Sequence, residues 1–154
     1  MKQQPPNSSA QAALRLDNQL CFALYSTSLM MTKAYKPLLE KIGLTYPQYL
    51  VMLILWQQDG IGLKDIGEQL FIDSGALTPV IKRMEAMGLL TRIRPAHNER
   101  SLEISLTAQG QQLKVAATEV NQQIGLQCGI ALADIQQLRD ELQQLRSQIQ
   151  QKLL

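Results

Sequence analysis

The sequence has few of the residues that bind metals or cross-link a protein. Its 154 residues include two cysteines, Cys21 and Cys128, and a single histidine, His97. Structural zinc sites usually need more cysteine and histidine ligands than this, and we expect no cofactor. Cysteines in a cytoplasmic chain are normally free thiols, which argues against a permanent structural disulfide.

Long apolar runs are also missing. Residues 1–11 are polar and contain nothing like the apolar segment of a signal peptide. The longest uninterrupted apolar run, 50–56, is far shorter than the ~20 residues that cross a bilayer. We therefore expect a soluble, cytoplasmic protein without a membrane partner.

Aromatic residues make up only 5% of the chain, whereas leucine, isoleucine, valine, alanine, methionine and glutamine are abundant. This composition favours helices over a β-sandwich or a barrel. The length suits one domain with a proper core and is too short for two. The expected fold is therefore mainly α, with one small β-hairpin.

The net charge is only +2, but its distribution is uneven. The stretch from Lys82 to Arg100 carries five lysines or arginines and two glutamates, a net of +3, which leaves −1 for the rest of the chain. A local basic patch of this kind suits a polyanion that touches one surface. Taken alone, it is about equally compatible with an ordinary solvated face.

Two short helical patterns follow each other in the middle of the chain. Apolar residues recur at helical spacing in 63–70 and again in 77–84. Residues 71–75 break the pattern, and either Asp73 or Ser74 can accept hydrogen bonds from the first amides of the second helix. The two segments predict a helix-turn-helix.

Two alternating runs, 90–94 and 102–106, come after the second helix and predict a β-hairpin. The whole segment has the pattern of a winged helix-turn-helix, whose second helix enters the major groove of double-stranded DNA. The residues that we expect to meet DNA are Ser74, Thr78, Pro79, Lys82, Arg83, Arg92, Arg94 and Arg100.

Three of these residues have alternative interpretations. Thr78 either contacts a base edge or a thymine methyl group, or it faces solvent. Arg100 either enters a minor groove from the hairpin tip or is simply exposed there. Pro79 removes a helical hydrogen bond. Either the helix begins at Ser74 with an irregular first turn, which the apolar stripe favours, or its regular part begins near Thr78.

The chain before this segment divides into three parts. Residues 1–13 have no periodic apolar face and are expected to be a disordered tail. A helical pattern starts at Leu14 and should kink or end near Lys36, before Pro37. Residues 45–48 have the sequence of a capping box, which opens a helix that is apolar nearly all round and is therefore expected to be buried.

We expect one domain over 14–154, with a DNA-binding lobe at about 46–106 and dimerisation helices at about 14–42 and 108–154. The last helix, expected to start at Asp134, has an apolar seam of coiled-coil type, formed by Ile135, Leu138, Leu142, Leu145 and Ile149. One small domain cannot bury all of these stripes, so they imply a homodimer. Its two recognition helices would have to lie about 34–36 Å apart to read a pseudo-palindromic operator.

Each cysteine lies on an apolar helical stripe, where cysteine is usually a small buried hydrophobic residue. Tyr25 lies one turn after Cys21 and could point its hydroxyl toward the sulfur. Tyr35 lies about 21 Å farther along a straight helix, but Tyr35 of the partner subunit could lie opposite Cys21 in a two-fold dimer. Phenol donors would stabilise a thiolate, the form that attacks peroxide.

These residues resemble a known family. The winged segment, ending in RSLEISLTAQG (100–110), is similar to the multiple-antibiotic-resistance regulator (MarR) family of dimeric transcription factors. Three stretches resemble its organic hydroperoxide resistance repressor (OhrR) branch: LDNQLCFALY (16–25), LTYPQYLVM (44–52) and LFIDSGALTP (70–79). The resemblance runs from about Leu14 to the last helix.

The resemblance implies a repressor that binds DNA when reduced and releases it when an organic hydroperoxide oxidises its N-terminal cysteine. Cys21 matches this peroxidatic cysteine. Tyr35 and Tyr46 match tyrosines that bond to it across the dimer, and Cys128 resembles the resolving cysteine of the two-cysteine subclass. The implied steps are thiolate, sulfenic acid, and then a disulfide with Cys128 of the partner subunit. A disulfide needs Cα atoms within about 7 Å, so its formation would move helices if the reduced cysteines lie farther apart.

This chain departs from the family pattern at one position of the wing. The family usually carries aspartate two residues before the wing arginine, whereas this chain has Asn98. The ion pair that would orient Arg100 is thereby weakened, and a neutral hydrogen bond takes its place. Two other functions stay open. One is a MarR-type regulator switched by a small aromatic ligand, with structural cysteines. The other is a thiol peroxidase. No acid or arginine of the kind that supports turnover lies near Cys21 in sequence, so we do not expect the protein to be an enzyme.

Overall fold

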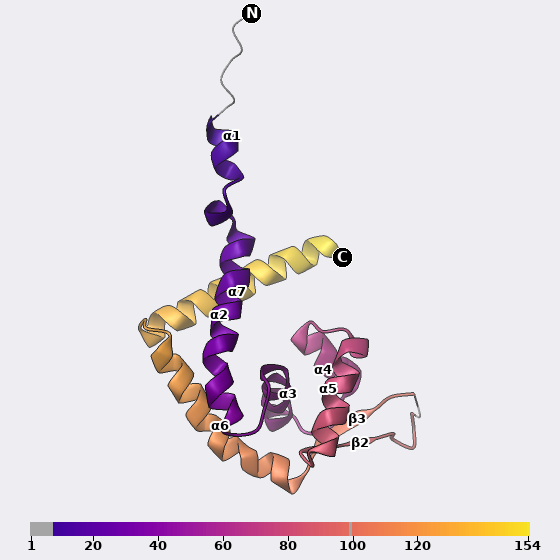
Figure 1. Cartoon of the computed structure of the whole chain (residues 1–154). Helices are drawn as coiled ribbons and strands as arrows, with labels where there is room; N and C mark the ends of the chain where they lie inside the picture. Colours follow the sequence, from indigo (N-terminus) through magenta and orange to yellow (C-terminus); the bar gives the residue numbers. More distant parts are fainter. Residues whose placement is uncertain (1–7, 99) are drawn as a thin grey trace, which may run out of the picture.

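The computed structural model describes residues 8–98 and 100–154 and is mainly helical, as the composition predicted. Its elements (Figure 1) are, in chain order, α1 (Ser8–Ala13), the 3₁₀-helix η1 (Leu16–Asn18), α2 (Leu20–Glu40), α3 (Tyr46–Gln57), β1 (Ile61–Gly62), α4 (Leu63–Leu70), α5 (Ser74–Ala86), β2 (Leu90–Ile93), β3 (Glu103–Leu106), α6 (Ala108–Gln127) and α7 (Leu132–Leu153). Within the described ranges, no helix combines the length and the apolar character that a bilayer span requires.

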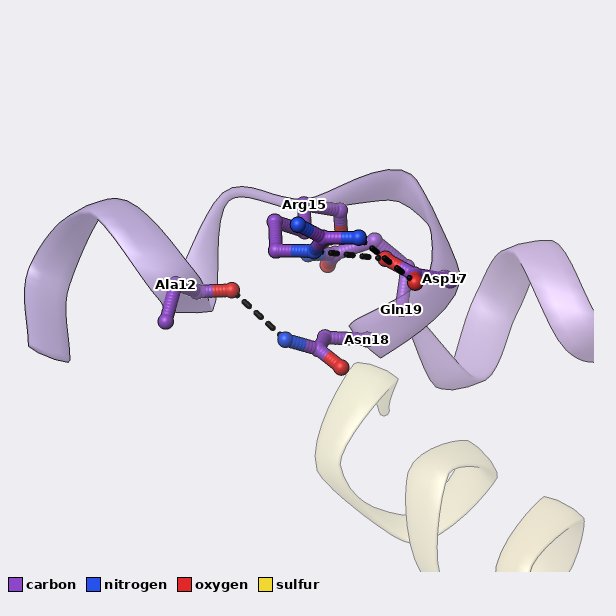
Figure 2. A network of polar contacts seen from close by, with 5 residues as sticks. All are labelled: Ala12, Arg15, Asp17, Asn18 and Gln19. Carbon is purple, nitrogen blue, oxygen red and sulfur yellow. Dashed lines mark hydrogen bonds and ion pairs between the residues drawn. The ribbon is translucent and has the colours of Figure 1, made fainter.

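The N-terminal segment differs from the expected disordered tail, because residues 8–13 form α1; residues 1–7 lie outside the described residues. Alanine has the highest helix propensity, and two side-chain amides bond to carbonyls at the end of α1. Asn18 Nδ2 donates to the Ala12 carbonyl at 2.7 Å (Figure 2), and Gln19 Nε2 donates to the Ala13 carbonyl at 2.6 Å. These bonds add side-chain donors to carbonyls at a helix end, where helical donors run out.

The next helix starts later than predicted. α2 begins at Leu20, not near Leu14, and η1 occupies part of the stretch between α1 and α2. An exposed ion pair between Arg15 Nη2 and Asp17 Oδ2, 3.0 Å apart, spans this turn (Figure 2). Cys21 therefore lies in the first turn of α2.

α2 also continues beyond Lys36, where a kink or an end was predicted, and stops at Glu40. A proline inside a helix costs about 3 kcal/mol. The two residues after Pro37 are buried, since only 8% of Leu38 and 1% of Leu39 is exposed. Burying one leucine contributes about 1.5–3 kcal/mol, so these two residues offset the missing hydrogen bond and the last turn of α2 is kept.

The capping box predicted before α3 is confirmed. Gln48 N donates to Thr45 Oγ1 at 3.4 Å, and Thr45 N donates to Gln48 Oε1 at 2.9 Å. The helix that follows packs against α2, α5 and α6. Its buried residues are Gln48, Tyr49, Val51, Met52, Ile54 and Leu55. α3 is therefore the central helix of the core, as its apolar pattern predicted.

The wing is a three-stranded antiparallel sheet, whereas the sequence predicted only a hairpin. β2 and β3 pair with Leu90 opposite Leu106, and β1 adds to the other edge of β3 with Ile61 opposite Ile104. A strand of two residues is too short to show an alternating pattern. Beside it, Asp59 Oδ1 accepts a hydrogen bond from Leu106 N at 2.8 Å. The segment between α3 and α4 is thereby tied to the wing.

α6 leads away from the winged segment and α7 runs back across α2, so that the three helices form an open frame (Figure 1). Thr107 caps α6, with Oγ1 accepting from Gly110 N at 3.1 Å. Gly129, at φ +69°, separates α6 from α7. α7 begins at Leu132, slightly before the predicted Asp134, and none of its residues is buried in the single chain.

Candidate nucleic-acid interface and thiol site

The turn between α4 and α5 is tightly closed. Ile72 N donates to the Gly67 carbonyl at 2.9 Å, and a Cβ on Gly67 would lie 2.8 Å from the Ile72 carbonyl oxygen. Only glycine fits such an approach without a shift of the backbone. Asp73, not Ser74, caps α5, and its Oδ2 accepts from Gly75 N at 3.2 Å. The turn thus fixes where the second helix of the motif begins.

α5 has one buried and one exposed side, as predicted. Leu77, Ile81 and Met84 are buried. Most of the predicted DNA contacts on this helix are exposed: Ser74, Pro79, Lys82 and Arg83. Thr78 is half-buried, and its hydroxyl donates to the Ser74 carbonyl at 2.8 Å. α5 starts at Ser74 and continues through Pro79 without a break. Of the two predicted alternatives, the helix therefore begins at Ser74 and not near Thr78.

Arg92, a predicted DNA contact, is bound by a carboxylate of α5. Its Nε and Nη2 donate to Glu85 Oε1 at 3.2 and 3.1 Å, and its backbone N donates to Glu85 Oε2 at 2.9 Å. Both side chains are half-buried. Three hydrogen bonds between two elements brace β2 against α5. Glu85 was not predicted as a site residue, although Glu85 faces Arg92 across the turn at Gly88.

Replacing Glu85 by glutamine should destabilise the protein at neutral pH, and this difference should shrink in acid. Hydrogen bonds from Arg92 hold the pKa of the Glu85 carboxyl below its ordinary value of 4.5. A carboxylate with a lowered folded-state pKa stabilises the fold above its unfolded pKa, and the stabilisation disappears as the pH falls through the folded pKa. Urea unfolding of both proteins at pH 7 and pH 3 measures the change. An equal difference at both values would contradict this role.

The hairpin tip holds the other wing residues. Arg94 and Arg100 are exposed, as is His97. Asn98 Oδ1 accepts a hydrogen bond from the backbone N of Arg100 at 3.2 Å. The side chain of Asn98 therefore contacts the backbone of Arg100. Glu99, which contributes to the charge of the basic stretch, lies outside the described residues.

The two thiols lie in different surroundings. Cys21, at the start of α2, is exposed, whereas Cys128, directly after α6, is half-buried. Cys128 Sγ donates to the Ile124 carbonyl at 3.3 Å. Tyr25, predicted to bond to Cys21, has 64% of its surface exposed. Neither cysteine is in a disulfide in this chain.

Three tyrosines gather at the junction of α2 and α3. The ring centroid of Tyr35 lies 5.0 Å from that of Tyr46 and 5.7 Å from that of Tyr49, and the last two are 6.5 Å apart. Burial raises the pKa of all three hydroxyls, so they stay protonated donors at neutral pH. Tyr49 was missed by the sequence analysis, although it lies one helical turn after Tyr46.

Cys128 affects one member of this cluster electrostatically. A charge on its sulfur contributes, after burial and the other two tyrosines, to the raised pKa of the Tyr35 hydroxyl of the same chain. Cys21 lies about 21 Å from Tyr35 along α2. A single chain thus brings Tyr35 and Tyr46 together and leaves Cys21 apart from Tyr35.

Comparison with known proteins agrees with this architecture. Residues 33–117 match the family model of the transcriptional regulator SarA/Rot. The organic hydroperoxide resistance transcriptional regulator of Bacillus subtilis is 49% identical over 134 residues, which cover 87% of this chain and 86% of that protein.

Two solved structures of AbfR, a Staphylococcus epidermidis protein, show the same fold. Reduced AbfR bound to DNA matches with a TM-score of 0.75 and 35% identity over 93% of this chain and 99% of the other. Disulfide-formed AbfR matches with a TM-score of 0.61 and 34% identity over 95% and 97% of the two chains. The Bacillus subtilis relative is a transcriptional regulator, and AbfR was solved bound to DNA. Together, the matches show that this chain belongs to the MarR family of winged-helix transcriptional regulators, in the branch of the organic hydroperoxide resistance regulators.

Proposed function

We propose that the protein is a homodimeric transcriptional repressor that releases its operator when an organic hydroperoxide oxidises Cys21. The observation that carries the proposal is the separation of Cys21 from the tyrosine cluster within one chain. Cys21 is exposed at one end of α2, whereas Tyr35 of the cluster lies about 21 Å farther along that helix. A second copy that packs antiparallel on α2 would bring its own cluster to Cys21.

The surface around Cys21 suits such a second copy. Large apolar side chains are exposed on and before α2 and on the α6–α7 side of the frame: Leu14, Leu16, Leu20, Phe22, Leu24, Leu29, Met30, Leu126, Ile130, Leu132, Leu138, Ile149 and Leu153. Extended apolar surface on a single chain marks an interface. An interface there would cover the stripes of α2 and α7 that one chain leaves unburied.

The proposed chemistry has two steps. The Cys21 thiolate attacks the terminal oxygen of the hydroperoxide, so that an S–O bond forms, the O–O bond breaks, and the alcohol leaves after taking up a proton. The Cys128 thiolate of the partner subunit then attacks the sulfenic sulfur, so that the S–S bond forms, the S–O bond breaks, and the hydroxide takes up a proton and leaves as water. Hydroxyls of Tyr35 and Tyr46 from the same partner cluster would donate to the first thiolate, since burial keeps them protonated.

Release of DNA would follow from the movement that the disulfide requires. Two recognition helices bind successive major grooves only when they lie about 34–36 Å apart. Bringing Cys21 and Cys128 of two subunits within bonding distance would move the helices that set this spacing. The closer match of this chain to reduced, DNA-bound AbfR than to its disulfide form supports an arrangement that is competent to bind DNA.

The exposed face of α5 is the proposed reader of the operator. Lys82 and Arg83 suit phosphates or guanine edges, and Ser74, Thr78 and Pro79 lie on the turns that would approach the bases. Arg94 and Arg100 of the wing would bind the backbone or an adjacent minor groove. Arg92 has part of its guanidinium bound to Glu85, so its main effect is to hold the wing in place.

Mixed dimers test the disulfide across the interface. Peroxide should cross-link neither Cys21→Ser nor Cys128→Ser homodimers through a Cys21–Cys128 bond, because each lacks one partner. Dimers exchanged between a tagged Cys21→Ser chain and an untagged Cys128→Ser chain should yield a covalent heterodimer on a non-reducing gel. A covalent dimer of Cys128→Ser chains alone would show that Cys128 is not the resolving residue. Absence of any heterodimer cross-link would reject the disulfide.

A further inference from the structure

The turn that precedes the recognition helix contains a strained residue. Phe71 ends α4 with φ +56°, and among the described residues it is the only non-glycine with a positive φ. Aromatic side chains seldom adopt this conformation, which persists where the surroundings hold it in place. The ring is 57% exposed, so packing in the core does not supply that support.

A cation from the C-terminal helix lies over this ring. The guanidinium carbon of Arg146 is 4.6 Å from the centre of the Phe71 ring. This distance is within the range of a cation–π interaction. The contact joins α7 to the turn between α4 and α5, two parts of the chain that belong to the dimerisation and DNA-reading regions.

The Arg146–Phe71 contact lies at an apolar groove. Between α7 and the turn lies an apolar groove of about 820 Å³, whose walls include Leu24, Phe71, Leu142 and Arg146. No residue of α7 is buried in the single chain. α7 is therefore not packed tightly against the turn, and the Arg146–Phe71 contact spans the groove.

We infer that Arg146 and Phe71 form a latch by which α7 holds the recognition helix in its DNA-binding position. Phe71 is two residues before the cap of α5, so a shift of the turn shifts the start of that helix. α7 begins just after Cys128, and Arg146 lies about 21 Å along it. A displacement of the Cys128 end of α7 therefore reaches the latch through a rigid element. This last step rests on the proposed redox function, whereas the latch itself does not.

DNA affinity of the reduced protein tests the latch. The probe is a fluorescent duplex that the reduced wild-type protein has selected from a random-sequence pool. Arg146→Gln should weaken binding about two- to fivefold, the range expected for an exposed cation–π contact. Phe71→Leu should have a similar effect, since leucine keeps the backbone penalty at this position and removes only the ring. The double variant should bind no more weakly than either single variant.

Matched variants separate the contact from charge and folding effects. Arg139→Gln removes a positive charge from the same wall of the groove, but Arg139 is paired with Asp140 at 2.8 Å, so binding should not change. Arg146→Lys and Phe71→Tyr keep a cation and a ring and should restore most of the affinity. Additive losses in the double variant, or equal losses from Arg139→Gln, would overturn the latch.

The oxidised protein gives the second readout. If the latch acts only in the DNA-binding arrangement, Arg146→Gln should leave the weak binding of peroxide-treated protein unchanged, and the ratio of reduced to oxidised affinity should fall by the same two- to fivefold. An unchanged ratio of affinities would show that oxidation does not act through the Arg146–Phe71 contact. The result for the reduced protein would still stand. Failure of Cys21 as the sensor would instead appear as release that survives Cys21→Ser.

Discussion

Cys21→Ser protein should bind DNA as tightly as the reduced wild type and should stay bound after treatment with cumene hydroperoxide. A serine hydroxyl is not ionised at neutral pH and does not reduce peroxides. Cys21 is exposed, so the substitution removes the nucleophile without opening a cavity. Wild-type protein should lose affinity about 5- to 150-fold on oxidation, the usual span of allosteric coupling. Fluorescence anisotropy with the selected duplex measures both proteins.

The same experiment distinguishes the competing functions. A regulator switched by an aromatic ligand would respond identically with and without Cys21, and release of the Cys21→Ser protein by peroxide would reject the thiol switch. A thiol peroxidase with a supply of reductant would consume peroxide continuously. The proposed repressor should instead stop after about one hydroperoxide per Cys21, as the two-step chemistry predicts. Thiol quantification during the titration provides this count.

Gly110→Ala should destabilise the protein strongly. A Cβ at this position would overlap the carbonyl oxygen of Leu89 and would lie 3.1 Å from Leu106 Cδ2. The Leu89 oxygen accepts from Thr107 N at 3.1 Å, and the Gly110 carbonyl accepts from Trp56 Nε1 at 3.0 Å. Backbone must therefore move, and we expect a loss of about 3 kcal/mol in the free energy of unfolding.

A matched control lies on the same helix. Gly125 is also in α6, and nothing approaches within 4 Å of a Cβ built there. Gly125→Ala should therefore stabilise the protein by about 0.5–1 kcal/mol, because alanine is the better helix former. Thermal unfolding should separate the two variants by about 7–16 °C at this chain length. Similar melting temperatures for both would contradict the close approach of α6 to Leu89.

Local sequence signals predicted the elements that local interactions specify. The Thr45–Gln48 capping box and the apolar faces of α4 and α5 need only residues within a few positions, and the structure confirms them. Cys21 lies on a helix as predicted, whereas Cys128 comes directly after one. The mainly α winged fold followed from these elements and their order.

Features that depend on contacts between distant segments were not predictable. Burial of Leu38 and Leu39 keeps α2 helical past Pro37, and the edge of β3 organises the two residues of β1 into a strand. The ion pair of Arg92 depends on how α5 meets β2. The proximity of Cys128 to Tyr35 depends on how α6 packs along α2. In each case the deciding energy comes from tertiary packing.

The Glu85–Arg92 brace has a consequence for how such regulators diversify. Because it joins β2 to α5, the wing and the second helix of the motif should move together as one unit. Under the proposed mechanism, oxidation would change how two such units are placed on DNA and would leave the bases that each one prefers unchanged. Substitutions on α5 would then retarget the regulator to new genes, and substitutions near Cys21 would alter the oxidant it answers to, with little interference between the two lineages of change.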